Sequence, residues 1–147
     1  MTIRLQTLIA AAESGDAEAM TDLALVYARG EEMQGVDAAK AVAWYQKAVG
    51  LGNRRAMGNL AYLYLNGISV PKDPVRAVGL YGEAVKGDFP DVGQCLYDLA
   101  GCYEEGEGVP RDVGQATALY RKACARGFGL ARKALVRLGV RCGHSES

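Results

Sequence analysis

The sequence has little of the side-chain chemistry that a hydrolase needs. Among its 147 residues there is one histidine, His144, and few serines, namely Ser14, Ser69, Ser145 and Ser147. A hydrolytic site requires a nucleophile with a general base held beside it. Because no such set can be assembled from these residues, we expect that the protein is not an enzyme.

The sequence also lacks a net charge and a long hydrophobic run. Its formal net charge is +0, so no field of the whole molecule favours nucleic acid or an anionic membrane. The last twenty residues are basic, and binding of nucleic acid through them is a weaker alternative to an ordinary solvated face. No apolar run approaches the ~20 residues that cross a bilayer, so we expect neither a nucleic-acid nor a membrane partner. The basic side chains of this end are Arg132, Lys133, Arg137 and Arg141.

The N-terminus allows two interpretations. Arg4 is followed by the apolar stretch 5–12, which loosely resembles a short signal peptide and would imply a periplasmic or secreted protein. The same residues fit the repeat described below. We therefore expect a cytoplasmic protein.

Cysteine pairs of the CxxC type are missing as well. Cys95 and Cys102 stand seven residues apart, about 10 Å along one helix, and cannot form a disulfide with each other. Cys142 lies two residues before His144, which is not the usual spacing of a structural zinc site. Free thiols are therefore predicted for these cysteines and for Cys124, with no metal and no cofactor.

What the sequence does contain is an internal repeat. Three copies align when Tyr27, Tyr64 and Tyr103 are superposed, at offsets of 37 and 39 residues. Each tyrosine follows a Leu-Ala pair and precedes a glycine by three residues. A second block of alanines and a tyrosine recurs behind each copy, with its apolar residues at helical spacing. Each copy therefore predicts two amphipathic helices. The second block contains Ala41, Tyr45 and Ala48, then Ala77, Tyr81 and Ala84, then Ala116, Tyr120 and Ala123.

The repeat predicts an all-α fold, a right-handed α-α solenoid of about eight helices arranged in antiparallel pairs. One pair cannot cover its own apolar face, so neighbouring pairs stack and share a core. The domain is expected over 1–142, with a half-unit at 1–15, units near 16–52, 53–90 and 91–127, a closing helix at 128–142, and a tail at 143–147. The expected helices are 3–14, 17–29, 38–51, 54–66, 74–87, 92–105, 113–126 and 129–141.

These motifs resemble the Sel-one-like repeat family of tetratricopeptide-related proteins. The third unit matches the family pattern best, through Leu99, Tyr103, Gly106, Gly108-Val109, Asp112, Ala116, Tyr120 and Lys122-Ala123. The first unit keeps Lys40-Ala41, Trp44-Tyr45 and Lys47-Ala48. The resemblance spans residues 8–139. It implies a bacterial protein-protein interaction scaffold or adaptor with a concave groove lined by the first helix of each pair.

The non-core positions of those first helices are the candidate partner-binding residues. They are Asp22, Leu25, Arg29, Arg55, Asn59, Tyr62, Asn66, Tyr97, Asp98, Glu105 and Arg137, with Glu18, Gly101, Lys133 and Val140 at further groove positions. Tyrosines, asparagines and mixed charges suit a peptide or protein loop. Packing of Tyr62 and Tyr97 against their own neighbours is an equal alternative. The adjacent acids Glu31-Glu32 and Glu104-Glu105 are expected to face water.

Two other functions stay open at this point. One is an immunity or inhibitor protein that occludes a toxin or enzyme. The other, less favoured because of the poor supply of catalytic side chains, is a hydrolase acting on cell-wall or antibiotic-like substrates, as the resemblance allows. The incomplete units at the two ends could form a homodimer.

Overall fold

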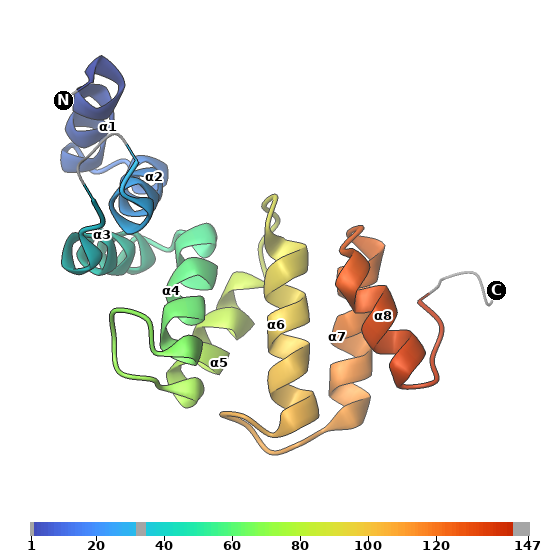
Figure 1. Cartoon of the computed structure of the whole chain (residues 1–147). Helices are drawn as coiled ribbons and strands as arrows, with labels where there is room; N and C mark the ends of the chain where they lie inside the picture. The colour runs from blue at the N-terminus through green and yellow to red at the C-terminus, as the bar shows by residue number, and fades with distance from the viewer. Residues whose placement is uncertain (1, 32–34, 143–147) are drawn as a thin grey trace.

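The computed structural model describes residues 2–31 and 35–142, and all regular structure within these ranges is α-helical (Figure 1). The predicted tail at 143–147 with His144, and Glu32 of the Glu31-Glu32 pair, lie outside the described residues. The helices are α1 (Ile3–Glu13), α2 (Ala17–Arg29), α3 (Ala38–Gly50), α4 (Arg54–Asn66), α5 (Pro74–Ala84), α6 (Val92–Glu105), α7 (Val113–Ala125) and α8 (Gly129–Arg137). The predicted all-α helical repeat fold is confirmed.

Acidic or amide N-caps start most of these helices. Asp37, Asp73 and Asp112 each accept a hydrogen bond from the backbone N–H three residues on, and they open the second helix of each pair. Asp16 and Asn53 do the same for α2 and α4. Capping satisfies an N–H that has no partner within the helix. The local sequence therefore fixes where each helix begins.

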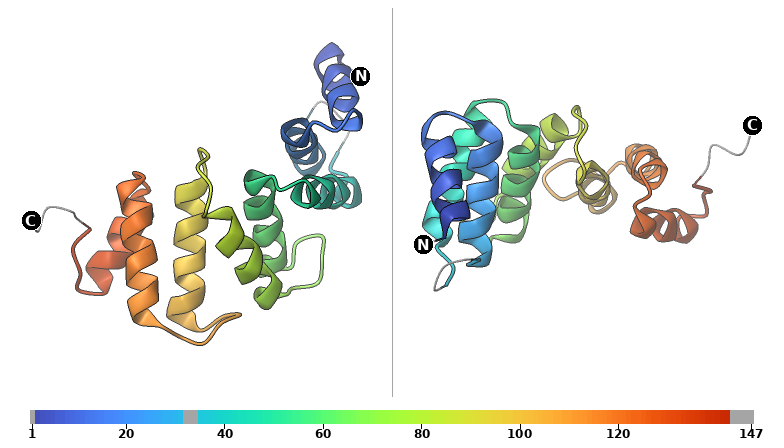
Figure 2. Two further views of the ribbon diagram at one scale, coloured as in Figure 1. Left: turned by 180° about the vertical axis from the view of Figure 1, so that it is seen from behind. Right: turned by 90° about the horizontal axis from the view of Figure 1, so that it is seen from above.

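The helices pair as antiparallel hairpins, α2 with α3, α4 with α5 and α6 with α7 (Figure 1). Alanines at recurrent positions let the backbones approach closely; Ala61 and Ala100 are fully buried. The repeated tyrosines Tyr45, Tyr81 and Tyr120 are at most 3 % exposed and fill the space between hairpins. The hairpins form a curved row with α1 and α8 at opposite ends of the molecule (Figure 2). The core is continuous from α1 to α8.

The loops within the second and third pairs each need a residue in the left-handed backbone region. Gly108 occupies this region in the third unit at φ 77°, where a Cβ would lie 2.4 Å from the Pro74 carbonyl oxygen. The equivalent residue in the second unit is Ser69, at φ 67°, the one non-glycine residue with positive φ in the described ranges. The second unit therefore adopts the same turn with serine in the place of glycine.

Five predicted helix ends differ from the structure, three of them by one residue and two by more. The fifth helix ends at Ala84 rather than at residue 87. The segment from Ala84 to Leu99 is three residues longer than the equivalent one from Ala48 to Leu60, and this insertion contains Phe89-Pro90. The last helix ends at Arg137 rather than at residue 141, and Gly139 then turns the chain at φ 75°. Val140, predicted to lie on the closing helix, therefore lies beyond it.

The prediction of free thiols is wrong for two of the four cysteines. Cys124 on α7 and Cys142 beyond α8 form a disulfide, with their Cα atoms 6.1 Å apart. The pair was missed because an extended last helix would carry Cys142 away from α7, whereas the turn after Arg137 brings it back. Cys95 and Cys102 are free and buried, as predicted. Burial raises the pKa of both thiols to about 12, so they behave as small core side chains.

Candidate functional site

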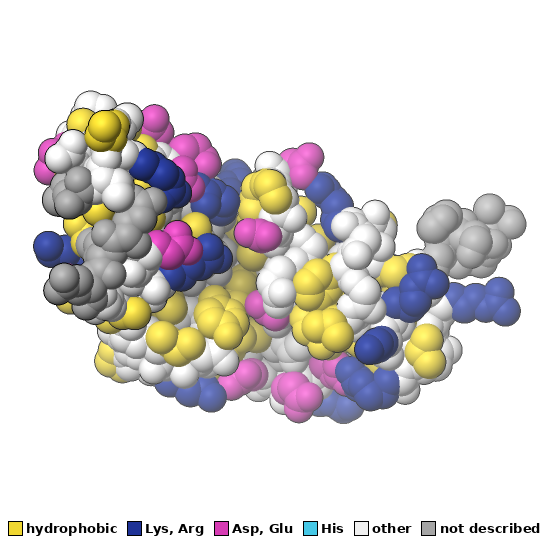
Figure 3. All heavy atoms as spheres, turned by 45° about the horizontal axis from the view of Figure 1, so that its top comes forward, with side chains coloured by type: hydrophobic (Ala, Val, Ile, Leu, Met, Phe, Trp, Pro, Cys, Tyr) yellow, Lys and Arg dark blue, Asp and Glu magenta, His cyan; other side chains and the backbone are white. Residues whose placement is uncertain are grey.

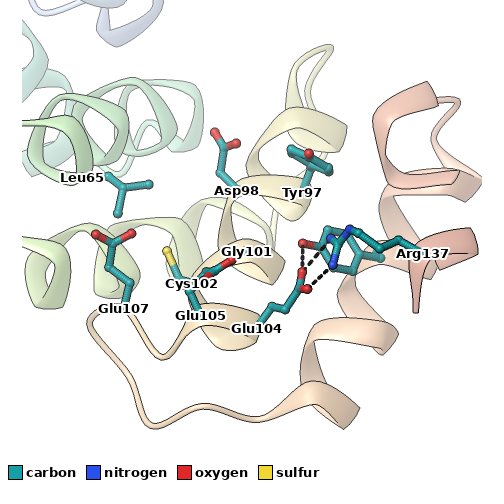
Figure 4. A pocket seen from close by; sticks show the side chains of 10 residues that line it. Leu65, Tyr97, Asp98, Gly101, Cys102, Glu104, Glu105, Glu107 and Arg137 are labelled. Carbon is teal, nitrogen blue, oxygen red and sulfur yellow. Dashed lines mark hydrogen bonds and ion pairs between the residues drawn. The ribbon is translucent and has the colours of Figure 1, made fainter. Parts of the chain in front are cut away.

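A pocket of about 270 Å³ lies in the third unit, between α4, α6, α7 and α8 (Figure 4). Four of the eleven predicted partner-binding residues line it: Tyr97, Asp98, Glu105 and Arg137. Two other hollows, one beside Tyr64 and Leu80 and one beside Pro90 and Phe128, contain none of those eleven. The structure therefore brings these four predicted residues together around one pocket. Its other lining residues are Leu65, Gly101, Cys102, Glu104, Glu107 and Tyr120.

One wall of the pocket is an ion pair held by a buried tyrosine (Figure 4). Glu104 accepts two hydrogen bonds from the Arg137 guanidinium, one of them at 3.0 Å, and a third from the Tyr120 hydroxyl at 2.7 Å. The Arg137 hydrogen bond lowers the pKa of Glu104, and the same contact raises the pKa of Arg137. The Glu104 side chain is only 11 % exposed, so the expectation that the Glu104-Glu105 pair simply faces water is wrong for Glu104.

Asp98 lines the pocket from α6, directly after Tyr97 and about one helical turn before Gly101. Its carboxylate accepts a hydrogen bond from the Tyr81 hydroxyl at 3.0 Å and one from Gln94 at 2.9 Å. Burial raises the pKa of Asp98, and these two hydrogen bonds offset only part of that effect. Burial also raises the pKa of Tyr81, with Asp98 adding to the rise. Asp98 is therefore held in one orientation by neutral donors.

The same relationship recurs along the molecule. Asn59, Asp98 and Arg137 are equivalent positions, 39 residues apart, and each lies beside the buried tyrosine of the preceding hairpin. Burial raises the pKa of Tyr45 to about 12, and the nearby Asn59 offsets a small part of this rise. Arg137 reaches Tyr120 through Glu104. In successive units the buried tyrosine thus lies near an amide, an acid and a base, and it bonds the acid Asp98 directly.

In the first two units the predicted residues contact mainly each other. Arg55 on α4 binds Asp22 at 2.5 Å and Glu18 at 3.0 Å, both on α2, so this trio joins neighbouring hairpins. The Asn66 amide donates to the Tyr62 carbonyl of its own helix. Tyr62 itself is 47 % exposed. Of the rest, Leu25 is half-buried, and Arg29 is exposed and pairs with Glu31 at 3.4 Å.

Tyr97 packs against two other rings. Its ring centroid lies 5.5 Å from that of Tyr120 and 5.1 Å from that of Phe128. Tyr97 is half-buried and still lines the pocket. Tyr97 therefore packs against its neighbours and also exposes part of its ring to the pocket. Tyr62 exposes a larger part of its side chain to solvent.

Sequence reasoning missed several residues of the pocket. Tyr120 belongs to the core repeat, and its hydroxyl was not considered as part of the groove. Glu107 pairs with Lys72 of the preceding unit at 3.2 Å, a contact between two loops that no spacing predicts. Glu104 lies in the last turn of α6. Its contacts with Tyr120 and Arg137 join it to the two helices that follow.

The described residues offer no site for a metal and no membrane-spanning helix. Across residues 2–31 and 35–142, no three His, Cys, Asp or Glu side chains are arranged to hold a metal ion. Within the same ranges, none of the helices combines the length and apolar character that crossing a membrane requires. Figure 3 shows a hollowed face beside the N-terminal helices on which hydrophobic, acidic and basic side chains are intermixed.

Comparison with known families now identifies the repeat. The Sel1 repeat model matches residues 17–53, 54–89 and 93–128, which is most of the chain. The chain belongs to the Sel1 repeat family. Sel1 repeats are generally protein–protein interaction modules, and the family is typically a non-catalytic scaffold. The predicted resemblance is confirmed.

Solved structures of bacterial proteins share this Sel1 repeat fold. A Sel1 repeat protein from Oxalobacter formigenes is 32% identical with a TM-score of 0.80, covering 92% of this chain and 99% of that one. A protective antigen of uropathogenic Escherichia coli with an SLR fold is 29% identical, TM-score 0.85, over 97% of this chain. This chain spans only 31% of the antigen's length. Cysteine rich protein B of Helicobacter pylori, 22% identical with a TM-score of 0.65, shares the fold over 91% of this chain and 98% of that one.

Proposed function

We propose that this Sel1 repeat protein is a scaffold or adaptor that holds one segment of a partner protein in its concave groove, with the pocket around Asp98 and Arg137 as the anchoring point. The observation that carries the proposal is that the polar side chains of the pocket are positioned by the fold. Glu104 is fixed by Tyr120 and Arg137, and Asp98 by Tyr81 and Gln94.

Fixed side chains matter because binding must overcome the entropy of ordering both surfaces. Each long side chain immobilised on binding costs about 0.5 to 1.5 kcal/mol. In the pocket this ordering is already achieved in the free protein, so a guest meets a preformed surface. Tyr62 and Tyr97 add aromatic area of the kind that dominates interface energetics.

The proposal is tested by capture of the native partner. The immobilised chain is exposed to lysate of its own cell, and the captured protein is identified, purified and measured for affinity. The double variant Tyr62→Ala and Tyr97→Ala should weaken that affinity by about tenfold or more. The control is Val75→Ala, at a 70 % exposed residue on α5. Equal affinity of the folded double variant would place the binding surface outside the groove.

A further inference from the structure

Gly101 is a glycine in the middle of α6 that the packing of the protein does not require. A glycine within a helix costs roughly 0.5 to 1 kcal/mol relative to alanine. A Cβ at position 101 would meet only the Tyr120 hydroxyl, at an ordinary contact distance of 3.9 Å. By contrast, a Cβ at Gly58 would lie 2.5 Å from the Cys95 Sγ, and one at Gly93 would lie 3.3 Å from Phe128.

The equivalent position in the other units carries a side chain. Leu25 occupies it on α2 and Tyr62 on α4. Tyr62 follows Leu25 by 37 residues and precedes Gly101 by 39. The absence of a side chain at Gly101 therefore leaves a gap in the groove floor that the repeat elsewhere fills. The pocket is this gap, and Gly101 lies at its centre (Figure 4).

The dimensions of the pocket suit one side chain of a guest. Its volume of about 270 Å³ is below the ~300 to 1,000 Å³ of typical small-molecule sites. Leu65 and the Tyr97 ring offer apolar surface at its sides, and the carboxylates of Asp98 and Glu105 offer acceptors. A guest with an apolar stem and a polar head matches this distribution.

The charge of the pocket selects the sign of that head. The pocket is lined by four carboxylates and one guanidinium. Glu104 is neutralised by Arg137 and Glu107 by Lys72. Asp98 receives only neutral donors, and Glu105 has no ion pair among the described residues. Two acids thus remain without a cation, one of them half-buried, where an opposite charge is worth more than in water.

We propose that the Gly101 pocket receives a lysine or arginine side chain of the partner segment, its stem against Leu65 and Tyr97 and its cationic head between Asp98 and Glu105. This inference rests on the proposed binding function and names the residue type that the groove selects. An inorganic cation does not fit, because no three carboxylate, thiol or imidazole groups of the described residues converge to hold one. A guest cation would also remove the cost of the uncompensated charge on Asp98.

The test uses short random peptides displayed on phage and selected against the full chain. The best binders are synthesised together with versions in which lysine is replaced by norleucine, or arginine by citrulline, which keep the stem and remove the charge. We expect a basic residue at one recurring position, and about tenfold weaker binding of the neutral versions. Parallel measurements use the chain variants Gly101→Leu, which fills the pocket, and Glu105→Gln, which removes one acid.

Both variants should weaken the selected peptides, Gly101→Leu by about tenfold or more. The matched control Glu13→Gln, at an exposed acid on α1 far from the pocket, should leave binding unchanged. If Gly101→Leu does not fold, peptide binding is measured with Gly101→Ala. The alanine methyl group occupies part of the pocket and meets only the Tyr120 hydroxyl, at 3.9 Å.

The outcomes separate this inference from the function it rests on. Some selected peptides could bind the wild-type chain and lose affinity for Tyr62→Ala, which shows that they occupy the groove. If such peptides lack a basic residue, or bind Gly101→Leu as tightly as the wild type, the inference is overturned and the scaffold function stands. Peptides insensitive to every groove variant would contradict both. Failure to select any peptide would also overturn the inference, while capture of the native partner still tests the scaffold function.

Discussion

The Tyr81 hydroxyl donates a hydrogen bond to Asp98 Oδ2 across 3.0 Å, joining the core of one hairpin to the groove surface of the next. Tyr81 is 1 % exposed, and Asp98 is half-buried in the pocket. A residue of the repeated core thus sets the orientation of a residue that differs between units.

Removal of the Tyr81 hydroxyl should destabilise the protein and loosen the pocket. Tyr81→Phe leaves the Asp98 carboxylate with one donor fewer, at a cost of about 1 to 2 kcal/mol in the free energy of unfolding. The measurement is urea unfolding followed by circular dichroism. Tyr62→Phe is the control, because Tyr62 is largely exposed, and it should change stability by less than about 0.5 kcal/mol. Equal stabilities of the two variants would contradict this role.

Glu104 should make stability depend on pH in the acid range. Because Arg137 lowers the pKa of Glu104 in the folded state, the unfolded chain binds more protons below about pH 4.5, the ordinary range of a glutamate. The contribution is present above that range and is lost as the pH falls through the lowered folded value.

The corresponding experiment compares urea unfolding of the wild type and Glu104→Gln from neutral to acid pH. The variant should be less stable by about 1 kcal/mol at pH 7, since Arg137 is partly exposed. The two should converge as the pH falls below that range. A difference that stays constant with pH would show that the carboxylate charge is not responsible.

The disulfide should stabilise the closing helix. Cys124 and Cys142 are 18 residues apart, and closing a loop of this size restricts the unfolded chain by about 3 kcal/mol. Cys142→Ser, or addition of a reductant, should lower the free energy of unfolding by up to this amount. Reductant added to Cys142→Ser should not lower the free energy of unfolding further. A further decrease would show that the reductant acts on something other than this disulfide.

Two helical glycines should respond in opposite directions to the same substitution. Gly101→Ala should stabilise the protein by up to about 1 kcal/mol, because the methyl group has room and alanine favours the helix. Gly58→Ala should destabilise it, since the new Cβ requires the buried Cys95 Sγ to move. Thermal and urea unfolding of the pair check this. A destabilised Gly101→Ala would mean that packing, and not the pocket, requires the glycine.

Overpacking of the helix contacts should show that the alanines are structural. Ala100 is fully buried, and Ala100→Leu should cost about 1 to 3 kcal/mol in unfolding free energy. Ala43→Leu, at an exposed position on α3, is the control with the same change in volume. If both variants unfold at the same urea concentration, close helix approach at Ala100 is not required.

The sequence by itself determined the fold because its information is periodic and local. Tyr27, Tyr64 and Tyr103 set the repeat length, and Asp37, Asp73 and Asp112 set the starts of the second helices. Each of these features acts within one or two turns of chain. A helix pair with one apolar face has few alternatives to stacking on another, so local pattern was sufficient for the solenoid.

Only the tertiary structure decided which groove residues form a pocket and which form contacts between units. Asp22, Asp98 and Arg137 occupy equivalent positions of the repeat. Asp22 binds Arg55 of the next hairpin, whereas Asp98 is held by Tyr81 and Arg137 by Glu104. The Cys124–Cys142 disulfide depends on where α8 ends. These contacts join residues of different helices, and their geometry depends on helix ends and on the stacking of whole hairpins, which the period of a sequence does not encode.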